Sequence, residues 1–210
     1  MHVVLLGDSI FDNASYVPGG PAVIDHLRTC LGEQGRATLL ARDGDICAGV
    51  PDQLASLPAD ATHLFLSVGG NDALGASGML HDTTRHAVDG FDNLARVQAQ
   101  FRSEYERTLA SLLDRKLPTA VCTIYSAIPG LSPRELAGLS VFNDVIVACA
   151  VQRGLAVIDL RTVCDRPEDY SSLSPIEPSE IGGRRIARAL HRVLTEHDYA
   201  SGRTVIFGAA

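Results

Sequence analysis

The stretch HVVLLGDSIFDN, residues 2–13, decides the expected architecture of the chain. Its first five residues are almost uniformly apolar, include two β-branched valines and end at Gly7. Such a run is typical of a central parallel strand that is covered on both faces. The polar residues Asp8 and Ser9 follow at once, so the strand is expected to deliver Ser9 into a turn at its carboxyl end.

The rest of the chain alternates further strands with helices. Four more apolar runs predict strands at residues 36–41, 62–68, 119–125 and 155–160. Helical spacing and helix start and stop residues predict helices at 21–35, 51–57, 96–116 and 132–154, and from Ser179 onward. The alternation calls for an α/β fold with a five-stranded parallel sheet and helices on both faces. Ligands of such sheets bind where the carboxyl ends of the strands meet their loops.

Composition limits the domain count and the partners. The 210 residues, 46% of them hydrophobic, are enough for a single domain spanning 1–210. A net charge of −7 disfavours nucleic acid and anionic membrane as partners, because phosphate surfaces attract clustered Lys and Arg. The one cluster of arginines, at positions 184, 185, 188 and 192, is expected on a solvated helix face. Oligomeric state is not encoded in any pattern of the sequence.

The first residues and the cysteines favour a cytoplasmic location. MHVVLLGDS carries no basic segment, its apolar run is too short for a signal peptide, and no later segment is expected to reach membrane-spanning length. The five cysteines are odd in number and lack C-x-x-C spacing. This pattern disfavours a disulfide framework and a zinc site.

Three predicted strand ends carry the residues that could do chemistry. Ser9 lies in GDSIFDN after the first strand, Gly44 in RDGD after the second and Asn71 in GGND after the third. A serine at a strand-to-helix turn presents an exposed hydroxyl and is a candidate nucleophile, although it could equally cap the next segment. The Ser9 amide, the Gly44 amide and the Asn71 side chain would together form a three-donor oxyanion hole. Singly, glycine and asparagine are ordinary turn residues.

At these motifs the sequence resembles the SGNH hydrolases, also called the GDSL esterase/lipase family. GDSIFDN is similar to the first block of that family, DGD to the second and GGND to the third. The resemblance implies a flavodoxin-like three-layer α/β/α sandwich. It also implies hydrolysis of small-molecule acyl esters, thioesters or acetyl groups on sugars through an acyl-enzyme on Ser9, with no cofactor. Gly44 and Asn71 would then be the oxyanion residues.

The fourth block departs from the family pattern. The family places Asp-x-x-His before its last helix, with His as the base, whereas this chain has Ser174-Pro-Ile-Glu177. The surrounding I-x-P-S-x-x-G-x-x-x-I-A pattern, residues 176–187, supports the alignment. A carboxylate can act as a general base, and a neutral Ser174 avoids the repulsion that an aspartate would cause. An unperturbed glutamate, with a pKa of about 4.3, would be a weak base unless burial raised its pKa.

Other residues could take over the role of base or bind a metal. His81 and His86 follow GGND in an irregular segment that could cover the site, and either is an alternative base. Asp8, Asp12, Asp45 and Asp72 gather at the same sheet edge, and clustered carboxylates can bind Mg²⁺ or Ca²⁺. Turn and capping roles explain these aspartates equally well, so no metal is assigned.

Two functions from other classes compete with the esterase. One is a catalytically inactive protein that keeps the fold and the pocket for binding a ligand. The other is a flavin-binding protein of the same topology, which is disfavoured because Asp8 and Asp12 in the first loop would repel phosphate.

Overall fold

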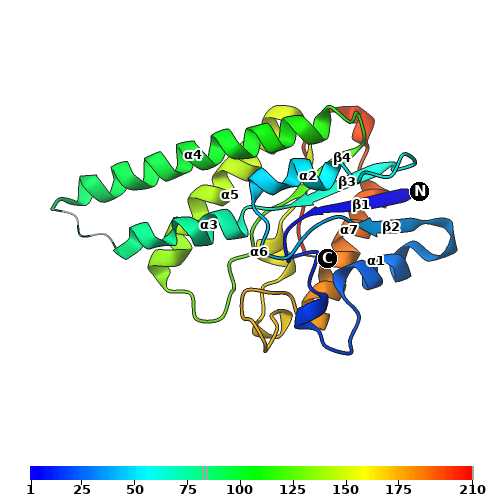
Figure 1. The fold of residues 1–210 in the computed structure, drawn as a ribbon, viewed down its shortest axis with the longest axis horizontal. Coiled ribbons are helices and arrows are strands. Elements are labelled where there is room, and N and C mark those ends of the chain that lie inside the picture. Colours follow the sequence, from blue (N-terminus) through cyan, green and yellow to red (C-terminus); the bar gives the residue numbers. More distant parts are fainter. Residues whose placement is uncertain (82, 84, 210) are drawn as a thin grey trace.

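The computed structural model describes residues 1–81, 83 and 85–209, without the side chains of Gln34 and His81. One six-stranded parallel sheet runs through this part of the chain in the order β2-β1-β3-β4-β5-β6 (Figure 1). Its strands are β1 (His2–Gly7), β2 (Arg36–Leu39), β3 (His63–Ser67), β4 (Thr119–Cys122), β5 (Ala156–Ile158) and β6 (Ile206–Phe207). The five predicted strands are confirmed, although all except β1 are shorter than predicted. The sheet has one strand more than predicted, β6. A two-residue strand is too short to produce a recognisable apolar pattern.

Helices cover both faces of the sheet, as the alternation predicted. They are α1 (Val23–Leu31), α2 (Val50–Leu54), α3 (Gly70–Ala76), α4 (Ala87–Leu113), α5 (Pro133–Arg153), α6 (Leu160–Val163) and α7 (Glu180–Glu196). The chain therefore has the predicted three-layer α/β/α arrangement, with the strand order of a flavodoxin-like sheet extended by one strand.

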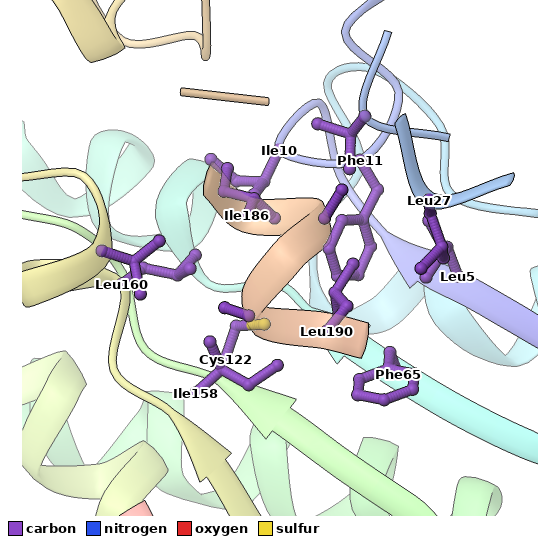
Figure 2. Packing of buried hydrophobic residues seen from close by; sticks show 14 of the residues in the cluster. Leu5, Ile10, Phe11, Leu27, Phe65, Cys122, Ile158, Leu160, Ile186 and Leu190 are labelled. Carbon is purple, nitrogen blue, oxygen red and sulfur yellow. The ribbon is translucent and has the colours of Figure 1, made fainter. Parts of the chain in front are cut away.

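The alternation of side chains along β1 divides the core into two clusters. Val3 and Leu5 face α1 and α7, where they join Phe11, Leu27, Ile186 and Leu190 (Figure 2). Val4 and Leu6 face the other side and pack in the cluster formed with α2, α4 and α5. Both faces of β1 are buried, which explains why its sequence is a continuous apolar run.

α5 begins and ends at the predicted residues, and α7 begins at its predicted cap. Ser132 accepts a hydrogen bond from Glu135 N at the start of α5, and Gly154, in the left-handed conformation with φ +65°, ends it. The Ser179 side chain caps α7 by accepting a hydrogen bond from Gly182 N. The α7 helix therefore starts three residues after Glu177, so its capped first turn helps to fix the position of the fourth block.

Two expectations, one about membrane-spanning length and one about the arginines of α7, need correction. α5, with a mean hydropathy of 1.4, has the length and composition of a membrane span, although no later segment was expected to reach spanning length. Its buried residues, among them Val145 and Ile146, belong to the core. The arginines of α7 are not simply solvated, because Arg185 pairs with the buried Asp169 and Arg192 lies over the Phe207 ring.

The irregular segment after GGND is partly helical and covers the site. It forms α3 and the 3-10 helix η4 (Ser77–His81) before α4 begins. η4 packs against α5, and α5 also packs against α4, as in the contact of Phe101 with Phe142. Figure 1 shows α3, α4 and α5 on the same side of the sheet's carboxyl end. The site is therefore covered by a segment for which the sequence pattern predicted no definite secondary structure.

Candidate active site

The carboxyl ends of β1 and β3 bring Ser9 and Asn71 together. The two strands are neighbours in register, with Gly7 opposite Ser67, and the chain leaves the sheet in opposite directions after them. Ser9 follows β1 by two residues, and Asn71 lies in the first turn of α3 after β3. Such a topological switch point is where doubly wound sheets bind their ligands.

Gly7 allows the turn that carries Ser9. Its φ is +124°, and a Cβ atom at this position would lie 1.8 Å from the Ser67 carbonyl oxygen. No residue with a side chain fits this approach. Asp8 N then donates a hydrogen bond of 3.0 Å to the same carbonyl. The turn that carries Ser9 is thus hydrogen-bonded directly to the end of β3.

Ser9, Asn71 and Glu177 line one cavity of about 160 Å³. Ser9 is 5% exposed and Glu177 is 4% exposed, so both side chains are screened from bulk water. The Ser9 hydroxyl lies close enough to the Glu177 carboxyl group to lower its pKa. The structure therefore brings together the two residues, 168 positions apart, that were predicted as nucleophile and base.

Burial changes the chemistry of Glu177. It raises the pKa of the carboxyl group from 4.5 to about 7, against the lowering effect of the Ser9 hydroxyl. Glu177 Oε2 has no hydrogen-bond partner among the described residues. A carboxylate with a pKa near 7 has almost the same affinity for a proton as an unperturbed histidine, whose pKa is about 6.5.

Three consecutive carbonyl groups fix the main chain around Glu177. Ile176 O accepts a hydrogen bond of 2.5 Å from the Tyr125 hydroxyl, and Glu177 O accepts one of 2.8 Å from Ser171 N. Pro178 O accepts one of 3.1 Å from Asn13 Nδ2. The donors come from three separate segments, so the position of Glu177 is determined from several directions.

Asn13 is a positioning residue that the sequence reasoning missed. It is fully buried, and its Oδ1 accepts a hydrogen bond of 2.9 Å from Val23 N at the start of α1. Its side chain therefore joins the first loop, α1 and the Glu177 segment. Its place at the end of GDSIFDN was the available signal, but the partner Pro178 lies 165 residues away.

Of the three predicted oxyanion donors, two line the cavity. Asn71 Nδ2 donates a hydrogen bond of 2.9 Å to Asp45 O, which leaves its second N–H available. Gly44 has φ +79° and is exposed, and it is not among the residues that line the cavity. Its loop is nevertheless attached to the site, because Asp45 is the residue that Asn71 contacts.

Asp8 contributes a second buried carboxyl group to the cavity. It is 2% exposed, and its Oδ1 accepts a hydrogen bond of 3.1 Å from Ile10 N. Burial raises the pKa of Asp8 to about 8, and the charge of Glu177 adds to the increase. Burial therefore shifts both carboxyl groups of the cavity toward their protonated forms.

Ser174 and His86 do not line the cavity. Ser174 contacts Glu177 through its main chain, where its carbonyl accepts a hydrogen bond of 3.1 Å from Glu177 N. His86 is exposed at the start of α4 and is not part of the cavity wall. The side chain of His81 lies outside the described residues.

The other aspartates at this edge have structural partners. Asp12 accepts a hydrogen bond from Asp43 N and Asp72 accepts one from Cys47 N. Asp45 accepts one of 2.7 Å from Gln53 Nε2, and Gln53, fully buried, also pairs with both main-chain groups of Gly7. Within the described part of the chain, no cluster of three or more His, Cys, Asp or Glu side chains has the arrangement of a metal site.

Comparison with known proteins places most of the chain in one protein family. Residues 5–192 match the GDSL-like Lipase/Acylhydrolase family. No curated relative matches the sequence.

Several solved structures share the fold at low sequence identity. The lipase Lip_vut3 from a goat rumen metagenome superposes with a TM-score of 0.73 at 17% identity, over 95% of this chain and 99% of the other. The acetyl xylan esterase AlAXEase gives 0.65 at 19%, over 90% and 96%. An acetyl xylan esterase variant, Axe2-W215I from Geobacillus stearothermophilus, gives 0.67 at 14%, over 94% and 95%.

Proposed function

The chain belongs to the GDSL-like lipase/acylhydrolase family, and we propose that it is a carboxylic ester hydrolase with Ser9 as nucleophile and Glu177 as general base. The observation that carries this proposal is the buried contact between the two side chains. Burial raises the pKa of Glu177 to about 7, which removes the main objection to a glutamate at the position of the family histidine.

The proposed reaction proceeds through an acyl-enzyme. Ser9 Oγ attacks the ester carbonyl carbon while its proton passes to the Glu177 carboxylate. The negative charge on the carbonyl oxygen is stabilised by the Ser9 amide and the second N–H of Asn71. Gly44 lies outside the cavity and is not assigned as a donor. The protonated Glu177 then gives its proton to the departing alcohol oxygen as the carbon–oxygen bond of the ester breaks.

Deacylation uses the same groups in reverse. A water molecule attacks the acyl carbon, its proton passes to Glu177, and the bond to Ser9 Oγ breaks as the hydroxyl recovers the proton. The carboxylic acid leaves, and the enzyme returns to its starting state. Ser174 is not assigned a proton-transfer role, because its contact with Glu177 is made by the main chain.

Hydrolysis of p-nitrophenyl butyrate and covalent labelling by a fluorophosphonate test this proposal. The wild-type protein is expected to release p-nitrophenol and to take up one label, and Ser9→Ala is expected to lose both. Ser140→Ala is a matched control, since Ser140 is exposed on α5 and bonds only within its helix. Turnover that survives in Ser9→Ala would contradict the proposal. A folded wild-type protein with neither activity would favour the ligand-binding alternative.

A further inference from the structure

The cavity beside Ser9 is walled mostly by apolar side chains. Ser9, Asn71, Glu177 and a few other polar groups supply its polar part, and the remainder comes from Val68, Leu74, Met79, Leu80, Leu139 and Phe142, with further apolar neighbours. These residues belong to the end of β3, to α3, to η4 and to α5. The helix α3, which begins within GGND, and the following η4 thus form part of the wall of the cavity that also contains Ser9.

The volume of the cavity limits what can fill it. An apolar cavity of about 150 Å³ in a protein core holds a benzene molecule, that is, about six carbon atoms. The cavity here has a volume of about 160 Å³ and therefore has room for a similar number. An acetyl group would leave most of this apolar surface without a partner.

The polar groups of the cavity fit an uncharged acyl chain better than a sugar or an anion. Asp8 and Glu177 are both buried here, and a negatively charged substrate would be repelled when Glu177 is ionised. The α3, η4 and α5 parts of the wall are mainly apolar, whereas a sugar ring requires several hydrogen-bonding partners for its hydroxyl groups.

We propose that this cavity is an acyl-chain site that selects medium-length acyl groups of about six carbons over acetyl groups. This inference rests on the proposed esterase function, because it names the substrate class of the same site. The chain would extend from the carbonyl carbon at Ser9 along the wall formed by η4 and α5. Each methylene removed from water in that wall is expected to raise kcat/KM by about fourfold until the cavity is full.

Gly138 offers a way to shorten the cavity without disturbing the catalytic groups. It lies inside α5 and lines the cavity, and a Cβ atom there would lie 3.7 Å from Leu80 Cδ2, at ordinary contact distance. Gly138→Leu adds a four-carbon side chain to the wall of a cavity that has room for about six carbons. Leucine also favours a helix interior more than glycine does, so the fold is expected to be kept. Gly90→Leu is the matched control, because Gly90 also lies inside a helix, α4, with no atom within 4 Å of an added Cβ.

The first experiment measures kcat/KM for p-nitrophenyl acetate, butyrate, hexanoate, octanoate and decanoate. The wild-type enzyme is expected to gain about fourfold per methylene up to hexanoate and little beyond it. Gly138→Leu is expected to lose about 50-fold on hexanoate, as when about three methylenes are displaced, and to change less than about twofold on acetate. Gly90→Leu is expected to match the wild type. Equal rates on acetate and hexanoate, with both still dependent on Ser9, would overturn the acyl-chain site and leave the esterase proposal intact.

The second experiment keeps the inference testable if no hydrolysis is found. Calorimetric titration of the Ser9→Ala variant with acetamide, butyramide and hexanamide measures binding without turnover. Affinity is expected to rise by about fourfold per methylene, and Gly138→Leu in the same background is expected to remove the rise. Chain-length-independent binding would refute the inference, whatever the outcome of the activity assay.

Discussion

Replacing Glu177 by glutamine is expected to abolish ester hydrolysis and, at alkaline pH, to stabilise the fold. Glu177 is 4% exposed, and burial raises the pKa of its carboxyl group from 4.5 to about 7. Glutamine has nearly the same shape and cannot ionise. The substitution therefore removes the base and the cost of burying its charge in one step.

The size of the stability effect follows from the pKa of Glu177. A raised pKa means that the folded protein binds the proton more tightly than the unfolded chain does, so the wild-type protein loses stability as pH rises from about 4.5 to 7. At about 1.4 kcal/mol for each pH unit, this interval corresponds to about 3 kcal/mol. The Gln variant is expected to match the wild type below pH 4.5 and to exceed its free energy of unfolding by up to about 3 kcal/mol above pH 7.

The loss of activity follows from the role of a general base. A positioned base contributes about 10²–10⁴-fold to rate, so kcat/KM of Glu177→Gln on p-nitrophenyl hexanoate is expected to fall by that factor. Oxyanion stabilisation is retained, so slow residual turnover that depends on Ser9 is expected to remain.

Urea denaturation at pH 4.5, 6 and 8 measures the stability, and initial rates measure the activity. The exposed Glu33→Gln serves as the control and is expected to change neither quantity. Full activity in Glu177→Gln would refute its role as base. A stability difference that does not grow between pH 4.5 and 8 would refute the claim that an ionised carboxylate is buried at this position.

Further predictions concern the pH profile and the residues that position the site. In the wild-type enzyme, kcat/KM is expected to fall about tenfold per pH unit below pH 7, because Glu177 must be ionised to accept the Ser9 proton; a limb near pH 4 would show that its pKa is not raised. Asn13→Ala removes the partner of Pro178 O and Val23 N and is expected to cost about 1–3 kcal/mol by urea denaturation and to lower kcat more than KM rises; unchanged kcat would argue against its positioning role. Gly7→Ala is expected to lower Tm sharply or prevent folding, since its Cβ would overlap the Ser67 carbonyl, and a wild-type melting curve would contradict this.

The sequence predicts features that depend on local pattern. The buried strand β1, the Ser9 turn, the caps of α5 and α7 and the alternation of strands and helices all follow from residues close together in the chain. Weak or short patterns were missed. β6 is only two residues long. α4 starts at Ala87, whereas the prediction placed its start near residue 96. The first turns were missed because their apolar residues, such as Val88 and Phe91, are exposed and do not form a buried stripe. The core stripe that identifies a buried helix face begins only later in α4.

The properties of the candidate site depend on contacts between distant segments. The pairing of Ser9 with Glu177 was predicted, but the raised pKa of Glu177 requires burial by residues of several elements, and no residue type encodes that burial. Asn13 and Gln53 bear ordinary polar side chains, and their roles appear only in their hydrogen bonds to Pro178 and Gly7. Gly44 was expected in the wall of the site, yet it lies outside the cavity because its loop is turned toward solvent.

The hydrogen bonds that hold residues 176–178 end on main-chain carbonyl oxygens and not on the Glu177 side chain. Backbone anchoring of this kind does not depend on which residue occupies the position. The position of residue 177 is thus independent of its side chain, and an imidazole could replace the carboxylate, or the reverse, within an unchanged loop. In evolutionary terms, a loop held in this way allows the residue at position 177, and position 174 with it, to change while the surrounding scaffold is inherited intact.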